Sequence, residues 1–164
     1  MTEKVAVITG SGDGLGKGIA QRLAQDGFRI VLSDINAATL EKTEAEFKSA
    51  GQAVTAFRGD VSRREDQFAL VQHAVQAFGR IDVFVNNAGI EDVMPLDKVT
   101  AADFDRVFGI NVKGVLFGIQ AAAEQMKKQG GDRICKIINA ASIAAHESYD
   151  LLGIYCASKF SVRA

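Results

Sequence analysis

The sequence predicts a doubly wound α/β fold, in which a parallel sheet carries helices on both faces. Five short β-branched runs alternate with longer runs of helical periodicity. The short runs are almost continuously apolar, as strands buried on both faces are. Because parallel neighbours need a right-handed crossover, each helix is expected to return the chain to the same end of the sheet.

The expected strands end where turn-forming residues begin. Their bounds are 4–10, 28–34, 53–61, 81–87 and 133–142. The expected helices lie between them, at 15–26, 37–50, 63–78 and 101–129. The last helix is preceded by Thr100, with Asp103 three residues later, which is a capping signature. Since no repeat or linker divides the chain, we expect one domain over residues 1–164.

Composition excludes several classes of function. A hydrophobic content of 48% and a net charge of −1 are typical of a globular chain with a buried core. The charges form no basic stripe, which argues against nucleic acid or an anionic membrane as a partner. No secretory signal and no apolar run of the ~18 residues that a membrane helix needs is found, so a cytoplasmic location is expected. Cys135 and Cys156 lack metal-ligand spacing, so we expect reduced thiols and no metal site.

A glycine-rich loop joins the first expected strand to the first expected helix, in the segment VITGSGDGLGKGIA. Gly10 suits a tight turn, and Gly14 and Gly16 leave no side chain between the backbone and a pyrophosphate. The start of the helix offers unpaired N–H groups to the same anion. A flexible connector is the alternative, but connectors rarely adjoin a strand and a helix so closely.

An acidic residue ends the second expected strand, eighteen residues beyond Gly16. The Asp34 carboxylate is able to accept hydrogen bonds from both ribose hydroxyls of an adenosine and repels a 2′-phosphate, which favours NAD over NADP. No Arg or Lys occurs from residue 10 to residue 16 to pair with a 2′-phosphate, which also favours NAD. The alternative is a solvated surface carboxylate.

Two further strand ends carry small or amide-bearing residues. GDV places Asp60 and Val61 after the third expected strand, and NNAG covers residues 86–89 after the fourth. Since carboxyl ends of parallel strands meet at one edge, these residues are expected to converge on a ligand there. Each motif alone is also a common turn.

Tyr155 and Lys159 are spaced to share one face of a helix near the carboxyl end of the sequence. An ammonium ~4 Å from a phenol stabilises the phenolate by up to ~4 kcal/mol at an effective dielectric near 20, which makes a better base. Tyr149 is rejected as the catalytic phenol because Gly153 stands four residues on. His73 is expected to be a surface or packing residue, and His146 lies in a loop that is expected to face substrate.

Taken in order, these motifs resemble the short-chain dehydrogenase/reductase family over essentially the whole chain. They are TGSGDGLG, Asp34, GDV, NNAG, Asn111 within GINVKG, Ser142 and YCASK. Within this family the chain is similar to the acetoin/diacetyl reductases, or 2,3-butanediol dehydrogenases. That similarity lies in NVKGVLFGIQAAAEQMKKQG, KIINAAS and YCASKFSVRA.

The resemblance implies a Rossmann fold and a role for each matching residue. Tyr155 is the implied general acid/base, Lys159 its activator, and Ser142 the hydroxyl that holds the substrate oxygen. Asn111 is implied to maintain a water-linked proton path to Lys159, with a structural amide bridging helix and sheet as the alternative. The implied cofactor contacts are Gly10, Gly12, Asp13, Gly14, Leu15, Gly16, Asp34, Asp60, Val61, Asn87, Ala88, Gly89, Tyr155 and Lys159.

The implied function is NAD(H)-dependent interconversion of a small ketone and a secondary alcohol, with diacetyl, acetoin and 2,3-butanediol as the expected compounds. A reductase of a sugar, a polyol or a 3-oxoacyl thioester is one alternative. An inactive cofactor-binding module is another. Family members form tetramers through helices, and Gly109, Gly114 and Gly118 are expected to let the helix at 101–129 approach a partner closely.

The sequence departs from the family after Lys159, where family members continue with further strands and a substrate loop. We therefore expect a chain shortened at its carboxyl end, so that KIINAAS forms an open, apolar sheet edge. Weak NAD binding and little turnover are expected of the 164 residues alone.

Overall fold

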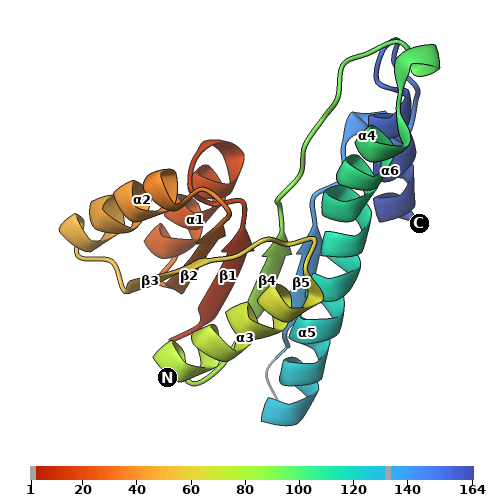
Figure 1. Ribbon diagram of the computed structural model, residues 1–164. Coiled ribbons are helices and arrows are strands. Elements are labelled where there is room, and N and C mark those ends of the chain that lie inside the picture. Colours follow the sequence, from red (N-terminus) through yellow and green to blue (C-terminus); the bar gives the residue numbers. More distant parts are fainter. Residues whose placement is uncertain (1–2, 132–133) are drawn as a thin grey trace.

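A five-stranded parallel sheet forms the centre of the computed structural model, which describes residues 3–131 and 134–164 (Figure 1). The strand order is β3-β2-β1-β4-β5, and every neighbouring pair is parallel. The strands are β1 (Val5–Thr9), β2 (Arg29–Asp34), β3 (Val54–Arg58), β4 (Val83–Asn86) and β5 (Lys136–Asn139). The predicted doubly wound fold is confirmed.

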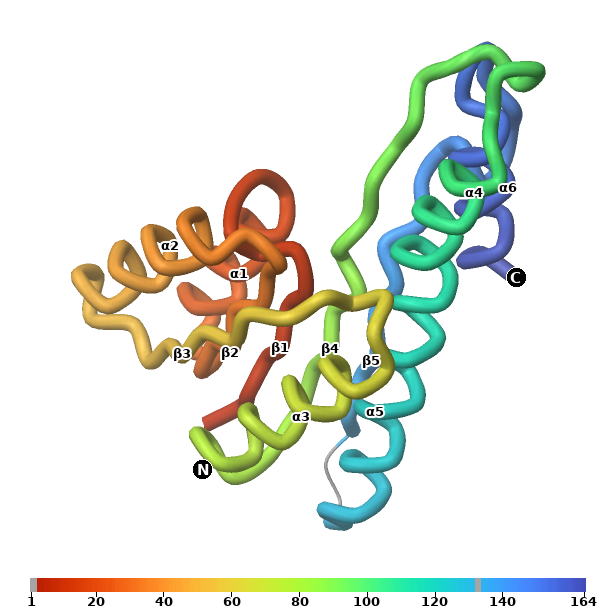
Figure 2. Tube along the Cα trace, viewed as in Figure 1, coloured from red at the N-terminus to blue at the C-terminus, as the bar shows by residue number. Residues whose placement is uncertain are grey.

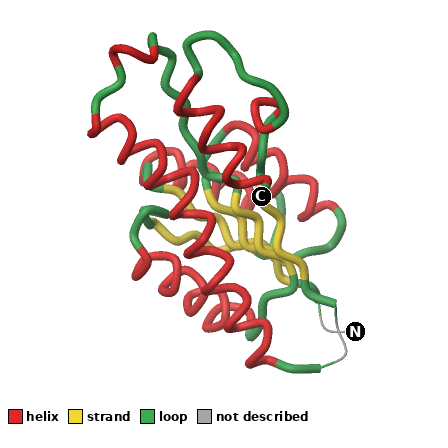
Figure 3. The backbone as a smooth tube through the Cα atoms, turned by 90° about the vertical axis from the view of Figure 1, so that its right-hand side faces the viewer, coloured by secondary structure: helices red, strands yellow, loops and turns green. Residues whose placement is uncertain are grey.

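Helices cover both faces of this sheet, as the view in Figure 3 shows. α1 (Gly14–Gln25) and α2 (Ala37–Ser49) pack on one face, with Ala6 and Ile8 of β1 beneath them. On the opposite face, α3 (Arg64–Phe78) and α5 (Gly114–Gln129) pack on Val5 and Val7. Alternate residues of β1 thus serve two separate cores, which explains why its sequence is continuously apolar.

The predicted strands and helices are all present, with shorter strands than expected. The third strand, expected over 53–61, ends at Arg58, where its pairing with β2 stops, so Asp60 and Val61 lie in the loop after β3. The predicted start of the last strand, residue 133, lies outside the described residues. The helix expected around Tyr155 is α6 (Gly153–Arg163).

The predicted helix at 101–129 is interrupted in its middle. α4 (Ala101–Phe108) leads into a π-helical turn, Gly109–Lys113, and α5 follows without a bend in the chain trace (Figure 1). The wider turn points Asn111 inward, where its amide is buried. At the start of α4, Thr100 and Asp103 form the expected capping box.

Gly114 and Gly118 of α5 pack against the loop after β3 and against β4, so the expectation that they face a partner helix is wrong. A Cβ atom added at Gly118 would lie 2.0 Å from Oδ1 of Asn86 in β4. A Cβ atom added at Gly114 would lie 3.0 Å from Cγ2 of Val61. The glycines therefore let α5 approach the sheet closely.

β5 forms one edge of the sheet, as expected. Its residues alternate between exposed and partly buried, and Ile138 is 48% exposed. Figure 2 shows that the segments after β4 and after β5 both extend beyond the strand ends and approach each other near the top of the view. They are joined where the Met94 N–H donates to the Leu151 carbonyl oxygen over 2.9 Å.

The remaining predictions concern isolated side chains. His73 packs as expected: its Nε2 lies 2.9 Å from Thr55 Oγ1, and its ring contacts Phe57. Cys156 is a buried free thiol, and the Cys135 Sγ lies 3.3 Å from Gln129 Nε2 and 3.6 Å from the Ile81 carbonyl oxygen. Within residues 3–131 and 134–164, no helix combines the length and the apolar character of a membrane span. The same residues contain no cluster of three or more His, Cys, Asp or Glu side chains placed to hold a metal ion.

Candidate active site

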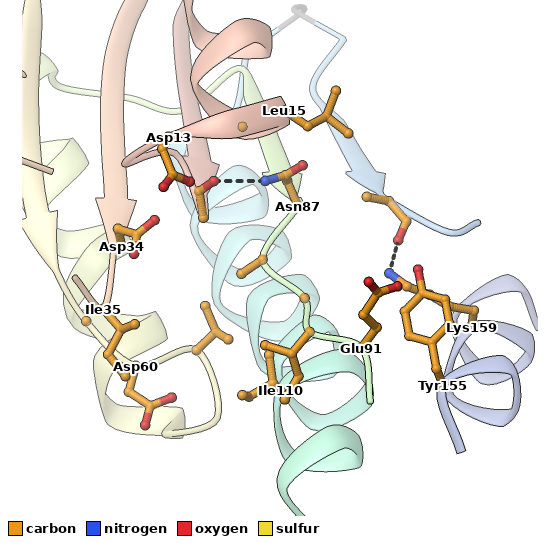
Figure 4. A pocket seen from close by; sticks show the side chains of 18 of the residues that line it. Asp13, Leu15, Asp34, Ile35, Asp60, Asn87, Glu91, Ile110, Tyr155 and Lys159 are labelled. Carbon is orange, nitrogen blue, oxygen red and sulfur yellow. Dashed lines mark hydrogen bonds between the residues drawn. The ribbon is translucent and has the colours of Figure 1, made fainter. Parts of the chain in front are cut away.

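A pocket of about 590 Å³ opens at the carboxyl ends of the strands, around the point where the strand order reverses between β1 and β4. This volume is within the range of sites for small molecules and cofactors. Most residues of the predicted cofactor site line it (Figure 4). They are Gly10, Asp13, Leu15, Gly16, Asp34, Asp60, Val61, Asn87, Ala88, Gly89, Tyr155 and Lys159.

The glycine loop is shaped by contacts that exclude side chains. Gly10 has φ +62°, and a Cβ atom there would lie 2.8 Å from the Cα of Ala88. A Cβ atom at Gly16 would lie 2.0 Å from the Gly10 carbonyl oxygen. By contrast, the space beside Gly14 is open within 4 Å, and the Asp13 side chain makes no capping bond to the first turn of α1. Open space next to uncapped N–H groups suits an anion.

Asn87 braces this loop from the end of β4. Its side-chain Nδ2 donates to the carbonyl oxygens of Thr9 and Gly10, each over 3.0 Å (Figure 4). The Thr9 hydroxyl in turn accepts from the backbone N–H groups of Asn87 and Ala88. Sequence reasoning placed Asn87 against a ligand but missed this bracing role, because the bonds join residues almost eighty positions apart.

Asp34 ends β2 at the rim of the pocket. One carboxylate oxygen accepts from the Gly12 N–H over 3.0 Å and the other accepts from the Asn36 N–H over 3.0 Å. Gly12 is thus held by Asp34 and is not itself among the lining residues. Arg58, the β3 neighbour of Asp34, directs its Nε to the Ile35 carbonyl oxygen.

Asp60 forms a turn and also lines the pocket. Its Oδ1 accepts from the N–H and the hydroxyl of Ser62, which makes the turn, and the residue also lines the pocket. Val61 lines the pocket as well and contacts Gly114 at the start of α5. The loop after β3 therefore links the pocket to α5.

Tyr155 and Lys159 project from α6 into the opposite side of the pocket from Asp34 (Figure 4). The Lys159 Nζ lies 5.7 Å from the centre of the Tyr155 ring. It donates to the Ala140 carbonyl oxygen over 2.8 Å, and the residue is only 6% exposed. Burial lowers the pKa of Lys159, because a desolvated ammonium loses its hydration.

Asn111 lies behind the pocket wall and is not among the lining residues. Its Oδ1 accepts from the Ile90 N–H over 2.9 Å, and its Nδ2 donates to the Ile90 carbonyl oxygen over 2.8 Å and to Ser158 Oγ over 3.0 Å. These bonds join the π-helical turn to the loop after β4 and to α6. A Cβ atom at Gly89 would lie 3.3 Å from Asn111 Oδ1 and 3.5 Å from Lys159 Nζ.

Ser142 lies just beyond the pocket. It precedes a short 3-10 helix, Ile143–Ala145, and its Oγ accepts from the Ala144 N–H over 3.1 Å. Ala140 and Ala141 line the pocket, whereas Ser142 does not. His146 and Tyr149, which follow, are exposed and also lie outside the pocket lining.

Sequence reasoning missed seven lining residues, which are Ile35, Gly59, Ile90, Glu91, Ile110, Ala140 and Ala141. Glu91 is exposed, and its carboxylate lies on the same side of the pocket as Tyr155 and Lys159 (Figure 4). Its position two residues after NNAG was the only available signal.

Comparison with known proteins gives consistent matches. The family model described as short chain dehydrogenase matches residues 4–164. A diacetyl reductase ((S)-acetoin forming) from Staphylococcus epidermidis is 56% identical over 98% of this chain and 62% of its own length. The diacetyl reductase ((S)-acetoin forming) of Staphylococcus aureus is 44% identical over 98% of this chain and 61% of its own length. An L-2,3-butanediol dehydrogenase from Corynebacterium glutamicum is 39% identical over 98% of this chain and 62% of its own length.

Solved structures agree with these sequence matches. A short chain dehydrogenase/reductase from Burkholderia phymatum, in complex with NAD, superposes with a TM-score of 0.94 and 38% identity, covering 98% of this chain and 57% of that one. The chain therefore spans about 60% of the length of the proteins that it matches.

Proposed function

Because the chain belongs to the short-chain dehydrogenase family, we propose that it carries the cofactor-binding and proton-transfer site of an NAD(H)-dependent oxidoreductase. The reaction interconverts a small ketone and a secondary alcohol. One observation carries the proposal: Tyr155 and Lys159 line the same pocket as the glycine loop that follows β1. An anion cradle and a phenol beside an ammonium are the two parts that hydride transfer to a carbonyl requires.

The lining residues fit a dinucleotide. The open space at Gly14 and the uncapped start of α1 suit a pyrophosphate. Asp34 suits ribose hydroxyls and repels a 2′-phosphate, which favours NAD over NADP. We assign the adenine end to Asp60 and Val61, and residues 87–89 to the wall along the adenosine part.

The chain's own residues supply the proton. When bound, the reduced nicotinamide supplies a hydride to the carbonyl carbon. Tyr155 donates its phenolic proton to the carbonyl oxygen, and in alcohol oxidation it takes that proton back. The Lys159 ammonium, fixed by the Ala140 carbonyl oxygen, stabilises the phenolate by its charge. Since Ser142 Oγ acts as an acceptor toward Ala144, its hydroxyl hydrogen is free for the substrate oxygen.

Diacetyl, acetoin and 2,3-butanediol are the substrates we propose for the natural protein. Support comes from the names of the relatives, which are diacetyl reductases and a butanediol dehydrogenase. Sugars, polyols and 3-oxoacyl thioesters remain the competing substrates. A substrate panel assayed by NADH oxidation separates them.

The decisive experiment measures diacetyl-dependent NADH oxidation by the protein as it is naturally encoded. Tyr155→Phe is expected to lower kcat by about 10²–10⁴-fold, the usual range for a general acid, while NADH binding is kept. Tyr149→Phe is the matched control, because it removes a nearby phenol that lies outside the pocket lining. An unmodified protein that binds NADH but reduces nothing on the panel indicates a silent cofactor-binding module instead.

We further propose self-association through α4, α5 and α6, as a homotetramer. The support is a set of exposed apolar side chains on these helices, Phe104, Leu116 and Phe160. Light scattering coupled to size-exclusion chromatography measures the mass directly.

A further inference from the structure

Glu91 is the only acidic residue on the catalytic side of the pocket among the described lining residues. The other acidic lining residues, Asp13, Asp34 and Asp60, lie toward the opposite side (Figure 4). The carboxylate of Glu91 instead shares its side with Tyr155 and Lys159. Lys159, the one lining cation in the described chain, already donates to Ala140.

The backbone around Glu91 is fixed on both sides. Before it, Ile90 exchanges two hydrogen bonds with the Asn111 side chain. After it, the Asp92 carboxylate forms an ion pair with Arg106 of α4. Within residues 3–131 and 134–164, no hydrogen bond or ion pair engages the Glu91 carboxylate itself. The neighbouring residues thus hold the backbone of Glu91 beside the pocket, and its carboxylate, without a partner among the described residues, faces whatever enters there.

From this arrangement we propose that Glu91 is a specificity-determining residue that excludes anionic substrates, so that the site takes uncharged ketones in preference to 2-oxo acids. The inference rests on the proposed function. A reacting carbonyl must lie within hydrogen-bond reach of the Tyr155 hydroxyl, so the groups attached to its carbon lie on the side of Glu91. A carboxylate accepts hydrogen bonds only and repels another carboxylate.

The size of the effect follows from the distance between the charges. We take two like charges about 6 Å apart and an effective dielectric of about 40, which lies between the values for a protein surface and for bulk water. Their repulsion is then large enough to change a rate constant about tenfold. Such repulsion acts on the bound substrate and falls as salt screens it. Specificity of this kind arises from a repulsive element rather than from an added contact.

Diacetyl and pyruvate form a matched pair of probes. Both are small 2-oxo compounds of nearly the same shape, and they differ in carrying a methyl group or a carboxylate oxygen beside the second carbonyl. The ratio of kcat/KM for diacetyl to that for pyruvate is measured with NADH for the naturally encoded protein and for Glu91→Gln. We expect the ratio to fall about tenfold in the variant, chiefly through a gain in pyruvate reduction.

Glu124→Gln is the control, because it removes the same charge from an exposed site on α5 outside the pocket lining. It is expected to leave the ratio unchanged. A salt titration of the unmodified protein needs no variant and is expected to lower the ratio as ionic strength rises.

Each outcome decides between the two proposals. If the unmodified protein reduces diacetyl but neither Glu91→Gln nor salt changes the ratio, the role of Glu91 is overturned and the proposed function stands. If the unmodified protein reduces neither compound nor any other ketone, the proposed function fails, and the role of Glu91 fails with it.

Discussion

The Nζ atom of Lys159 lies 5.7 Å from the centre of the Tyr155 ring, one helical turn along α6. A positive charge in this position stabilises the negative charge that develops on the phenol oxygen during proton transfer. Replacing Lys159 with Met keeps the side-chain length and removes that charge. We expect kcat for alcohol oxidation to fall by about 10²–10³-fold, because a preorganised charge beside the reacting oxygen is lost. Lys127→Met, at the exposed end of α5, is expected to leave kcat unchanged.

Burial of Lys159 also predicts how stability depends on pH. Its pKa is lowered from the ordinary value of 10.5 by desolvation, so between the folded and ordinary values the unfolded chain binds more protons. Folding stability from this group is therefore expected to rise as pH rises through that window and to be lowest below it. Urea unfolding at a series of alkaline pH values measures this, and subtracting the Lys159→Met curve isolates the contribution. A difference curve that falls with pH contradicts the prediction.

The close approach of Gly16 to Gly10 predicts a severe effect of one methyl group. A Cβ atom at residue 16 would meet the Gly10 carbonyl oxygen at 2.0 Å, and both are parts of the backbone. Gly16→Ala is expected to destabilise the fold by about 1–3 kcal/mol and to weaken NADH binding. Gly18→Ala, one helical half-turn away, meets nothing within 4 Å and is expected to stabilise α1 by up to about 1 kcal/mol. Thermal unfolding and NADH fluorescence titration compare the pair.

Asn111 gives a prediction that separates its donor from its acceptor. Asn111→Ala removes the side-chain partner of the Ile90 N–H, the Ile90 carbonyl oxygen and the Ser158 hydroxyl. It is expected to cost about 2–4 kcal/mol, since three bonds are lost near the buried π-helical turn. Asn111→Asp keeps the acceptor for the Ile90 N–H but loses the donor and places a buried carboxylate oxygen opposite the Ile90 carbonyl oxygen. Urea unfolding at neutral pH is therefore expected to show it no more stable than the alanine variant. Equal stability of all three proteins rules out the bracing role.

The carboxylate of Asp34 predicts cofactor preference. Asp34→Asn removes the charge and keeps an acceptor for the Gly12 N–H. The ratio of the Kd for NADPH to the Kd for NADH is expected to fall at least tenfold, because repulsion of the 2′-phosphate is relieved. Asp97→Asn, outside the pocket lining, is the control for net charge. An unchanged ratio in Asp34→Asn assigns the preference to other residues.

The architecture and most of the pocket lining were predictable because their signals are local. The doubly wound sheet follows from continuously apolar strands such as β1, in which each face has its own core. Asp34 and Gly10 were found because a strand end and a glycine loop mark an edge at which ligands bind. In each case, short stretches of sequence determine where the residue lies.

The features that sequence reasoning missed depend on contacts between distant segments. The spacing of Gly114 and Gly118 fits either face of a helix, and only packing against Val61 and Asn86 decides between them. The bond pair between Asn111 and Ile90 joins residues 21 positions apart and leaves no periodic trace in the sequence. Glu91 lies in a loop, where no pattern fixes the direction of a side chain.

The π-helical turn at Gly109–Lys113 has a consequence for how the molecule tolerates change. A single π-helical turn holds one residue more than an α-helix would need between the same two helices. Deleting one residue there would therefore fuse α4 and α5 into an uninterrupted α-helix. In that helix, α4 and α5 would each still turn the same side chains toward the protein. The glycine contacts of α5 would survive such a deletion, while the inward Asn111 would be lost. A one-residue deletion would therefore keep the packing of the helices and remove the support that Asn111 gives to the active site.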